Sequence, residues 1–195
     1  MQESIINLIN ESVRTFTKIS EDQHQVVLIE NITNTILNAF NSDNKLLLCG
    51  NGGSAADSQH IAAEFTGRFL KERESVPAIS LTTNTSVITA IGNDYGYDKV
   101  FSRQVSGLLN KKDCLIGIST SGKSQNIILA FEEAKKIGAK TISFTGHDPS
   151  PLSLMADFSY NAPSLDTPRI QECHIFLGHF ILEKVEDYII SKKKN

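Results

Sequence analysis

From Lys45 onward, short apolar runs alternate with stretches of helical periodicity, and this alternation constrains the fold of the 195-residue chain more than any other feature. Such alternation is typical of βαβ units, whose parallel strands are buried on both faces. It predicts an α/β fold: a three-layer, doubly wound, flavodoxin-like parallel sheet of five strands with flanking helices. The expected strands are residues 46–49, 76–81, 114–119, 140–144 and 157–160.

The first forty residues carry apolar positions at helical spacing, which predicts two helices before the first strand. The whole chain, residues 1–195, is expected to form one domain, since this length buries a full core without disulfides or metals. Its parts would be N-terminal helices at 1–41, an α/β core at 45–162 and a C-terminal helix at 167–190. The helices expected within the core are residues 55–70, 85–91, 100–109, 124–137 and 151–155.

Composition excludes several function classes. A net charge of -3, from 19 basic and 22 acidic residues, gives no electrostatic footprint for nucleic acid. No apolar run approaches the roughly 20 residues of a membrane span, and no signal-peptide pattern follows Met1. The three cysteines are an odd number without a Cys-x-x-Cys pair, which is typical of a reducing compartment. We therefore expect a cytoplasmic protein without nucleic-acid or membrane partners.

Two loops rich in Gly and Ser follow the first and third expected strands, where open parallel sheets bind ligands. In the first loop, residues 50–54, three glycines allow a ligand to approach the backbone, and Ser54 is expected to cap the next helix. The second loop, residues 119–124, places four hydroxyls at a helix N-terminus, which favours an anion. Each loop alone is equally compatible with a tight turn and a capping serine.

Neither loop has the spacing of a nucleoside-triphosphate or dinucleotide motif, so the pair favours a compact phosphorylated molecule. On the helix after the first loop, His60 and Glu64 are four residues apart and share one face. Such a pair can chelate a metal, share acid–base work or be an ordinary surface pair. In the last helix, Gln171 and His179 lie about 12 Å apart along the axis, so spacing alone favours Gln171 with His174 for a shared ion.

These residues resemble the sugar isomerase (SIS) domain of phosphoheptose isomerases, and the likeness covers nearly the whole chain. It is carried by the residues 49–60, Glu64, 66–69, 92–94, 119–122 and 169–172. The family interconverts sedoheptulose 7-phosphate and D-glycero-D-manno-heptose 7-phosphate on the way to ADP-heptose and lipopolysaccharide. It forms homotetramers with active sites between subunits. The resemblance therefore implies an isomerase, one Zn²⁺ per subunit and a homotetramer.

The resemblance also assigns roles to individual residues. It makes Glu64 and His179 catalytic, and it overrules the spacing preference for His174. It implies that the zinc ligands are His60, Glu64, Gln171 and His179. It implies that the substrate contacts are Asn51, Gly52, Gly53, Ser54, Glu64, Asn93, Asp94, Ser119, Thr120, Ser121, Ser124 and Gln171.

Two comparisons limit these expectations. The bacterial replication-initiator-associating protein shares the fold but lacks the carboxylate and imidazole that match Glu64 and His179, and this chain has both. Pro168 stands where some members carry an aspartate that contacts the sugar, so that contact is not expected here. The rival hypotheses are a non-catalytic adaptor or sugar-phosphate sensor on the same fold, and an isomerase for a different sugar phosphate.

Overall fold

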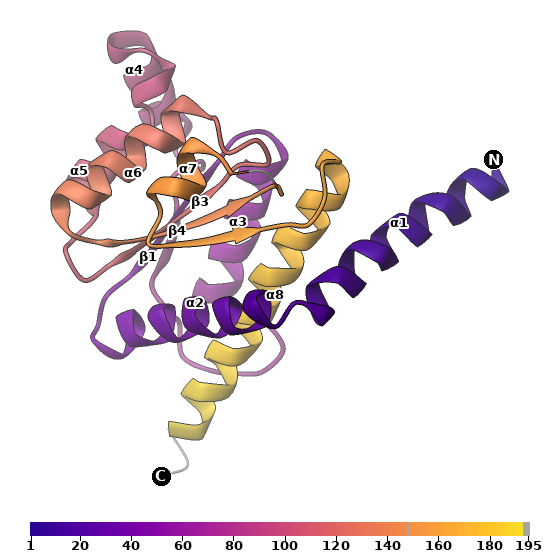
Figure 1. Ribbon diagram of the computed structural model, residues 1–195. Helices are drawn as coiled ribbons and strands as arrows, with labels where there is room; N and C mark the ends of the chain where they lie inside the picture. Colours follow the sequence, from indigo (N-terminus) through magenta and orange to yellow (C-terminus); the bar gives the residue numbers. More distant parts are fainter. Residues whose placement is uncertain (148, 193–195) are drawn as a thin grey trace.

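The computed structural model describes residues 1–147 and 149–192, with a central sheet between layers of helices (Figure 1). All pairings between neighbouring strands are parallel, and the strand order β2-β1-β3-β4-β5 is the flavodoxin-like order. The predicted α/β class and five-stranded parallel sheet are confirmed. In chain order the elements are α1 (Gln2–Glu21), α2 (Gln23–Asn41), β1 (Leu46–Gly50), α3 (Gly53–Thr66), β2 (Ala78–Ser80), α4 (Thr85–Tyr95), the 3-10 helix η1 (Tyr97–Lys99), α5 (Ser102–Leu108), β3 (Cys114–Ile118), α6 (Gln125–Ile137), β4 (Lys140–Thr145), α7 (Pro151–Met155), β5 (Phe158–Asn161) and α8 (Thr167–Lys192).

Most predicted elements lie within a few residues of their expected positions. The second strand is shorter than expected, because only the three residues of β2 pair with β1. The helix expected at 55–70 begins earlier and ends at Thr66, where Gly67 follows as its C-cap. None of the helices within residues 1–147 and 149–192 has both the length and the apolar character of a membrane span.

Strand order determines where the two loops lie. β1 and β3 are neighbours in the sheet and pair from Leu46 with Cys114 to Gly50 with Ile118. β1 pairs on its other side with β2, and β3 with β4, so chain order reverses between β1 and β3. The loops after these two strands therefore lie side by side at the switch point of the sheet, where ligands bind in open α/β folds.

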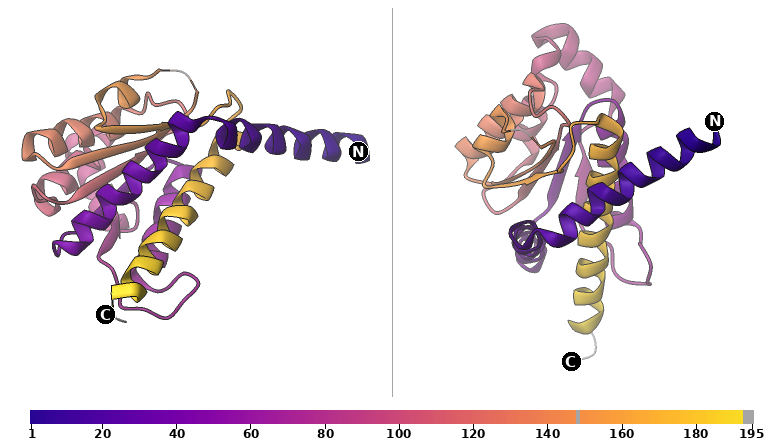
Figure 2. Two further views of the ribbon diagram at one scale, coloured as in Figure 1. Left: turned by 60° about the horizontal axis from the view of Figure 1, so that its bottom comes forward. Right: turned by 45° about the vertical axis from the view of Figure 1, so that its right-hand side comes forward.

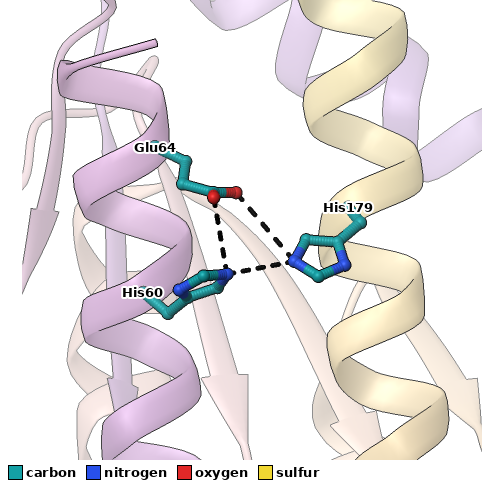
Figure 3. A group of neighbouring side chains, drawn as sticks. All are labelled: His60, Glu64 and His179. Carbon is teal, nitrogen blue, oxygen red and sulfur yellow. Dashed lines mark hydrogen bonds and ion pairs between the residues drawn. The ribbon is translucent and has the colours of Figure 1, made fainter. Parts of the chain in front are cut away.

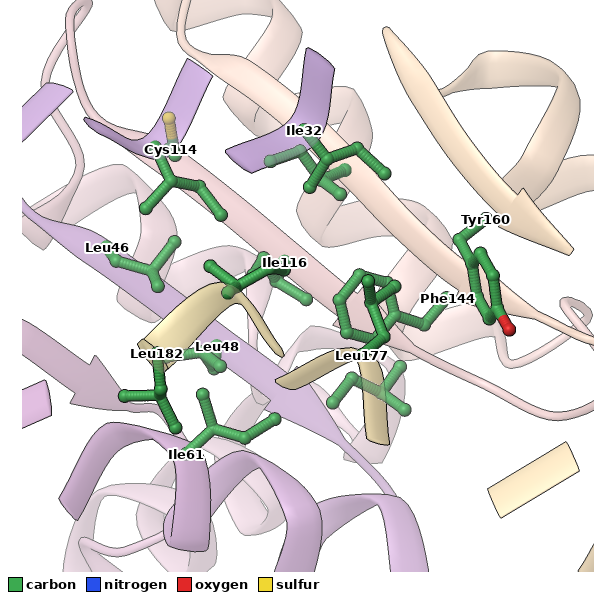
Figure 4. Packing of buried hydrophobic residues seen from close by; sticks show 14 of the residues in the cluster. Ile32, Leu46, Leu48, Ile61, Cys114, Ile116, Phe144, Tyr160, Leu177 and Leu182 are labelled. Carbon is green, nitrogen blue, oxygen red and sulfur yellow. The ribbon is translucent and has the colours of Figure 1, made fainter. Parts of the chain in front are cut away.

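Two hydrophobic clusters pack on opposite faces of the sheet, because successive side chains of a strand alternate in direction. Leu46 and Leu48 of β1 belong to the cluster with α2, α3 and α8, whereas Leu47 faces the cluster with α5, α6 and α7. Figure 4 shows the first cluster, in which Leu177 of α8 and Ile61 of α3 lie against strand side chains. α3 and α8 thus share one face of the sheet.

Two glycines allow α3 and α8 to approach closely. A Cβ on Gly53 would lie 2.3 Å from Nε2 of Gln171, and a Cβ on Gly178 would lie 2.6 Å from Cδ1 of Ile61. The end of the Gln171 side chain can move aside, whereas Ile61 is buried in the core, so it is the missing side chain of Gly178 that sets the spacing of the two helices. This contact brings together side chains more than one hundred residues apart in the sequence.

The N-terminal helix has few contacts with the rest of the chain. α1 extends away from the sheet, as two further views make plain (Figure 2). A groove of about 1280 Å³ lies between α1, α2 and α8 and has mainly apolar walls, including Phe16, Leu37 and Phe180. Large apolar side chains that are more than half exposed on α1 are Ile5, Ile6, Leu8, Ile9 and Val13. Exposed apolar surface on this scale is typical of an interaction face.

Candidate active site

The first loop turns sharply between β1 and α3. Gly52 has φ +55°, and a Cβ on Gly50 would lie 2.4 Å from the carbonyl oxygen of Ser54, so both positions need glycine. Gly52 is also the N-cap of α3, and no side chain caps the helix. The predicted cap by Ser54 is therefore wrong, because Ser54 is already inside the first turn and buried. The first N–H groups of α3 remain without a side-chain partner.

The second loop is organised by its own hydroxyls. Oγ of Ser119 accepts the N–H of Gly122 at 3.1 Å and lies 3.1 Å from Oγ of Ser124. Ser124 is the N-cap of α6, and its side chain makes no cap hydrogen bond. The positive end of α6 and its first N–H groups are thus directed at the loop, an arrangement that favours an anion such as phosphate.

A pair of amides joins the two loops. Nδ2 of Asn51 donates to Oδ1 of Asn126 at 2.9 Å, and Nδ2 of Asn126 donates back to Oδ1 of Asn51 at 2.9 Å. The hydroxyl of Tyr97 also donates to Oδ1 of Asn51, at 3.2 Å. Asn126 is buried, so this pair fixes the first loop against the start of α6. Sequence reasoning missed Asn126, although its position just after the second loop was an available signal.

Three chemically reactive side chains meet between α3 and α8 (Figure 3). Nε2 of His60 lies 3.0 Å from Nε2 of His179 and 3.5 Å from Oε1 of Glu64. Nε2 of His179 lies 4.0 Å from Oε2 of Glu64. The side chains of His60 and His179 are 47% and 40% exposed and that of Glu64 is 23% exposed, so solvent and ligands can reach the cluster. Helical spacing had placed His60 and Glu64 on one face, and the fold adds His179.

The cluster fits a metal ion. One ligand atom from each residue lies within 4.8 Å of the others, and the donor set of two imidazole nitrogens and a carboxylate oxygen suits a divalent metal. Ligand atoms about 2.1 Å from a tetrahedral ion lie about 3.4 Å apart, close to the separations between these side chains. Oε2 of Glu64 is buried without a hydrogen-bond partner, which is costly unless a cation or substrate supplies one.

Asp57 lies one turn before His60 on α3. Its carboxylate is partly buried, and Oδ2 has no hydrogen-bond partner. Burial raises the pKa of Asp57, and the nearby His60 opposes that shift.

His174 lies outside the cluster. It is fully buried, and its Nε2 lies 3.0 Å from the carbonyl oxygen of Thr145, beside the rings of Phe144 and Tyr160. Burial lowers the pKa of His174 to about 4, so this imidazole is neutral at pH 7. The spacing preference that paired His174 with Gln171 is therefore wrong, because His174 is part of the core.

The remaining predicted residues lie on other elements. Gln171 is on α8 with its amide against Gly53, and among the described residues no hydrogen bond joins it to His60, Glu64 or His179. Asn93 and Asp94 are exposed on α4 and hydrogen-bond to each other at 2.8 Å. Within the described part of the chain, neither is hydrogen-bonded to the loops or the cluster. One chain thus assembles the two loops and three of the four predicted ligands.

Comparisons with known proteins agree with this geometry. The model of the SIS domain family matches residues 8–146. Phosphoheptose isomerase from Clostridium acetobutylicum is 49% identical over 185 residues, which is 95% of this chain and 94% of that protein. The phosphoheptose isomerase of Sulfurimonas denitrificans is 47% identical over the full length of both chains.

Solved structures give the same result. The structure of phosphoheptose isomerase from Neisseria gonorrhoeae is similar with a TM-score of 0.89 and 41% identity, covering 95% of this chain and 98% of that one. Sequence and structural likeness thus extend over nearly the whole of each relative. The chain therefore belongs to the phosphoheptose isomerase family of SIS-domain proteins, and it is an isomerase.

Proposed function

We propose that this isomerase converts sedoheptulose 7-phosphate into D-glycero-D-manno-heptose 7-phosphate, a step toward the ADP-heptose of lipopolysaccharide. The observation that carries the proposal is the cluster of Glu64 with two imidazoles at the end of the helix that starts from the first Gly-rich loop. A carboxylate and an imidazole are the two groups that an aldose–ketose exchange needs. The relatives named phosphoheptose isomerase support a sugar phosphate as the substrate.

The two loops hold the phosphate end of the substrate. Ser54 and Ala55 donate their N–H groups to the carbonyls of Asn51 and Gly52, so at the start of α3 the N–H of Gly53 is the donor for the anion. The first N–H groups of α6 and the hydroxyls of the second loop complete the anion site. Because the Asn51–Asn126 pair joins the loops, they form one rigid cradle. The residues assigned to substrate binding are Asn51, Gly52, Gly53, Ser54, Glu64, Asn93, Asp94, Ser119, Thr120, Ser121, Ser124 and Gln171.

The chemistry proceeds through an enediol. Glu64 removes a proton from C1 of the ketose, while His179 gives a proton to the C2 oxygen. His179 then takes the proton from the C1 hydroxyl, and Glu64 returns its proton to C2, which yields the aldose. The 4.0 Å between Oε2 of Glu64 and Nε2 of His179 lets both groups reach neighbouring atoms of one substrate.

Four residues are proposed to hold one Zn²⁺ per subunit: His60, Glu64, Gln171 and His179. The ion would act as a Lewis acid toward the substrate oxygens. A carboxylate that binds a metal is a weak base, but the two oxygens of Glu64 differ in their surroundings. Oε1 lies 3.5 Å from Nε2 of His60 and Oε2 lies 4.0 Å from Nε2 of His179, so an ion held through one oxygen would leave the other to act as the base.

We also propose that the chain forms a homotetramer in the cytoplasm. The exposed apolar side chains of α1 and the groove between α1, α2 and α8 support burial against further copies. Active sites between subunits would give the exposed Asn93 and Asp94 a neighbouring site to enter. Three buried, free cysteines fit a reducing compartment. Light scattering after size exclusion tests the assembly, which should have four times the mass of one chain.

The test of the function is incubation of the purified protein with sedoheptulose 7-phosphate, followed by NMR for the aldose. The wild-type protein should form the aldose, and Glu64→Gln should turn over about 10²- to 10⁴-fold more slowly, since it keeps the shape but loses the base. Glu132→Gln is the matched control, because Glu132 is an exposed carboxylate on α6. Glu132→Gln should turn over sedoheptulose 7-phosphate at the wild-type rate.

Two results would overturn these assignments. If folded Glu64→Gln kept wild-type turnover, Glu64 would not be the base. If the wild type left sedoheptulose 7-phosphate unchanged but isomerised a shorter sugar phosphate, the substrate assignment would be wrong. Chelation with elemental analysis tests the metal separately, because full activity in a zinc-free preparation would remove Zn²⁺ from the reaction.

A further inference from the structure

A single buried carboxylate holds the segment that follows α3. Glu186 of α8 is 1% exposed and accepts the backbone N–H groups of Phe69, Leu70 and Lys71 at 3.2, 3.0 and 2.8 Å. Three donors occupy most of the acceptor sites of this carboxylate and offset the loss of its hydration. The segment of residues 69–71 is therefore fixed to α8 through its main chain.

Arg73 fixes the same segment to the end of α3. Its guanidinium donates to the carbonyl oxygens of Glu64, Phe65 and Gly67, at 2.5, 2.6 and 3.2 Å. The last carbonyls of a helix lack intrahelical partners, and a cation there is favourable. Nε of Arg73 lies 3.6 Å from Oε1 of Glu186, and both side chains are 1% exposed. A buried ion pair thus joins the end of α3, from which Glu64 projects, to α8.

The segment held in this way places an aromatic ring on His179. The rings of Phe69 and His179 are nearly parallel, with an interplanar angle of 19° and centroids 5.4 Å apart. His60 meets the same imidazole edge-on, with an interplanar angle of 70°. Glu186 is seven residues after His179, two turns along the same face of α8. One face of α8 therefore carries both the imidazole of His179 and the carboxylate that holds Phe69 beside it.

We propose that Phe69, anchored by Glu186, is a positioning residue that keeps Nε2 of His179 directed at His60 and Glu64. The proposal rests on the proposed function, because Phe69 acts through His179. A histidine that is 40% exposed can populate several rotamers, and contact with a fixed aromatic ring removes most of that freedom. The loops bind the phosphate independently of this ring. Loss of Phe69 should therefore lower kcat and leave KM nearly unchanged.

Three variants test the proposal. Phe69→Leu removes the ring and keeps an apolar side chain, and Phe69→Tyr restores the ring. Phe158→Leu is the matched control, because Phe158 is also partly buried against the same core cluster but lies on β5. Each variant is assayed with sedoheptulose 7-phosphate for kcat and KM.

NMR gives a readout that does not depend on activity. The chain has five histidines, so ¹H–¹³C spectra of protein labelled on the histidine rings contain few signals, and His179→Gln identifies those of His179. In the wild type these signals should carry the ring-current shift of Phe69, both in chelator-treated and in zinc-loaded protein, because the two rings are stacked. Phe69→Leu should remove that shift, Phe69→Tyr should keep it, and Phe158→Leu should leave it unchanged.

We expect kcat of Phe69→Leu to fall about tenfold or more, with KM within about threefold of wild type and kcat restored in Phe69→Tyr. Unchanged His179 signals in Phe69→Leu would overturn the proposal, and so would a lost shift with wild-type kcat. If the wild type does not isomerise sedoheptulose 7-phosphate, the proposed function fails. The NOE between the rings of His60 and His179, whose centroids lie 5.3 Å apart, then decides the positioning role: it should weaken in Phe69→Leu and keep its wild-type strength in Phe69→Tyr, and an unchanged NOE in Phe69→Leu would overturn the proposal.

Discussion

His174 and His179 lie five residues apart on α8 and have opposite surroundings. His174 is fully buried, its Nε2 lies 3.0 Å from the carbonyl oxygen of Thr145, and burial lowers its pKa to about 4. His179 is 40% exposed and faces His60 and Glu64. At about 100° per residue, the two imidazoles point about 140° apart around the helix, so one enters the core and the other the site.

The role of each histidine therefore depends on the face of α8 that it occupies. Gln171 lies about 60° from His174 and about 80° from His179 around α8, and it is much nearer to His174 along the axis, so spacing favoured the wrong histidine. The close contact of α8 with α3 decides, because it directs the face of His179 toward Glu64. Two predictions test whether His179 serves catalysis and His174 serves stability, and a third tests whether Gln171 belongs to the site.

The largest expected effect separates the two histidines by activity. His179→Gln should lower kcat about 10²- to 10⁴-fold, because it removes a proton-transfer group. His174→Leu should leave kcat within about threefold of wild type once the protein is folded, because His174 does not touch the reacting atoms. Steady-state assays with sedoheptulose 7-phosphate measure both. Equal losses of kcat in the two variants would show that His174 and His179 do not have separate roles.

The next effect is on stability and its pH dependence. The pKa of His174 is about 4 in the folded chain and about 6.5 when unfolded. Between these values the unfolded chain binds the extra proton, so the contribution of His174 to stability falls as pH drops below about 6.5 and levels off near pH 4. The shift corresponds to about 3 kcal/mol of unfolding free energy in total.

Urea unfolding between pH 4 and 7 measures this contribution as the difference between wild type and His174→Leu. At pH 7 the variant should be about 1–3 kcal/mol less stable, because Thr145 loses its hydrogen-bond donor. The difference should shrink as pH falls. If the unfolding free energies of the two proteins changed in parallel with pH, His174 would not carry the pH dependence. His179→Leu, on the exposed face of α8, serves as the control.

The smallest expected effect concerns Gln171. Gly53→Ala would place a Cβ 2.3 Å from Nε2 of Gln171, the far end of a flexible side chain, which can move aside. Stability should change by less than about 1 kcal/mol, since alanine favours the helix. Zinc affinity and KM should each worsen by about three- to tenfold, as measured by competition with a chelator and by kinetics. Unchanged values for both would remove Gln171 from the site.

Much of the fold could be predicted from the sequence, because alternating apolar runs determine strands and helices locally. The position of each loop followed from the strand that precedes it, and the pairing of His60 with Glu64 followed from helical spacing. The cap by Ser54 was wrong, because Gly52 adopts φ +55° and takes the N-cap position. That conformation depends on the turn and not on capping preference.

Other features depend on contacts between distant segments. The approach of α3 to α8 requires Gly178 to face Ile61, and nothing in the local sequence of either helix indicates the partner. The reciprocal pair of Asn51 with Asn126 likewise joins the loop after β1 to the start of α6, 75 residues later in the chain. Residue roles that came from the resemblance, above all that of His179, had no basis in spacing alone.

Between the Nε2 atoms of His60 and His179, 3.0 Å apart, there is room for one proton. When both rings are neutral, one is the Nε2–H tautomer and donates, and the other is the Nδ1–H tautomer and accepts. A cation that uses both Nε2 lone pairs requires the Nδ1–H form of each ring. Binding of such a cation would therefore be coupled to a tautomer change in one imidazole, without any change in net protonation, and nitrogen chemical shifts of the two rings would report it directly.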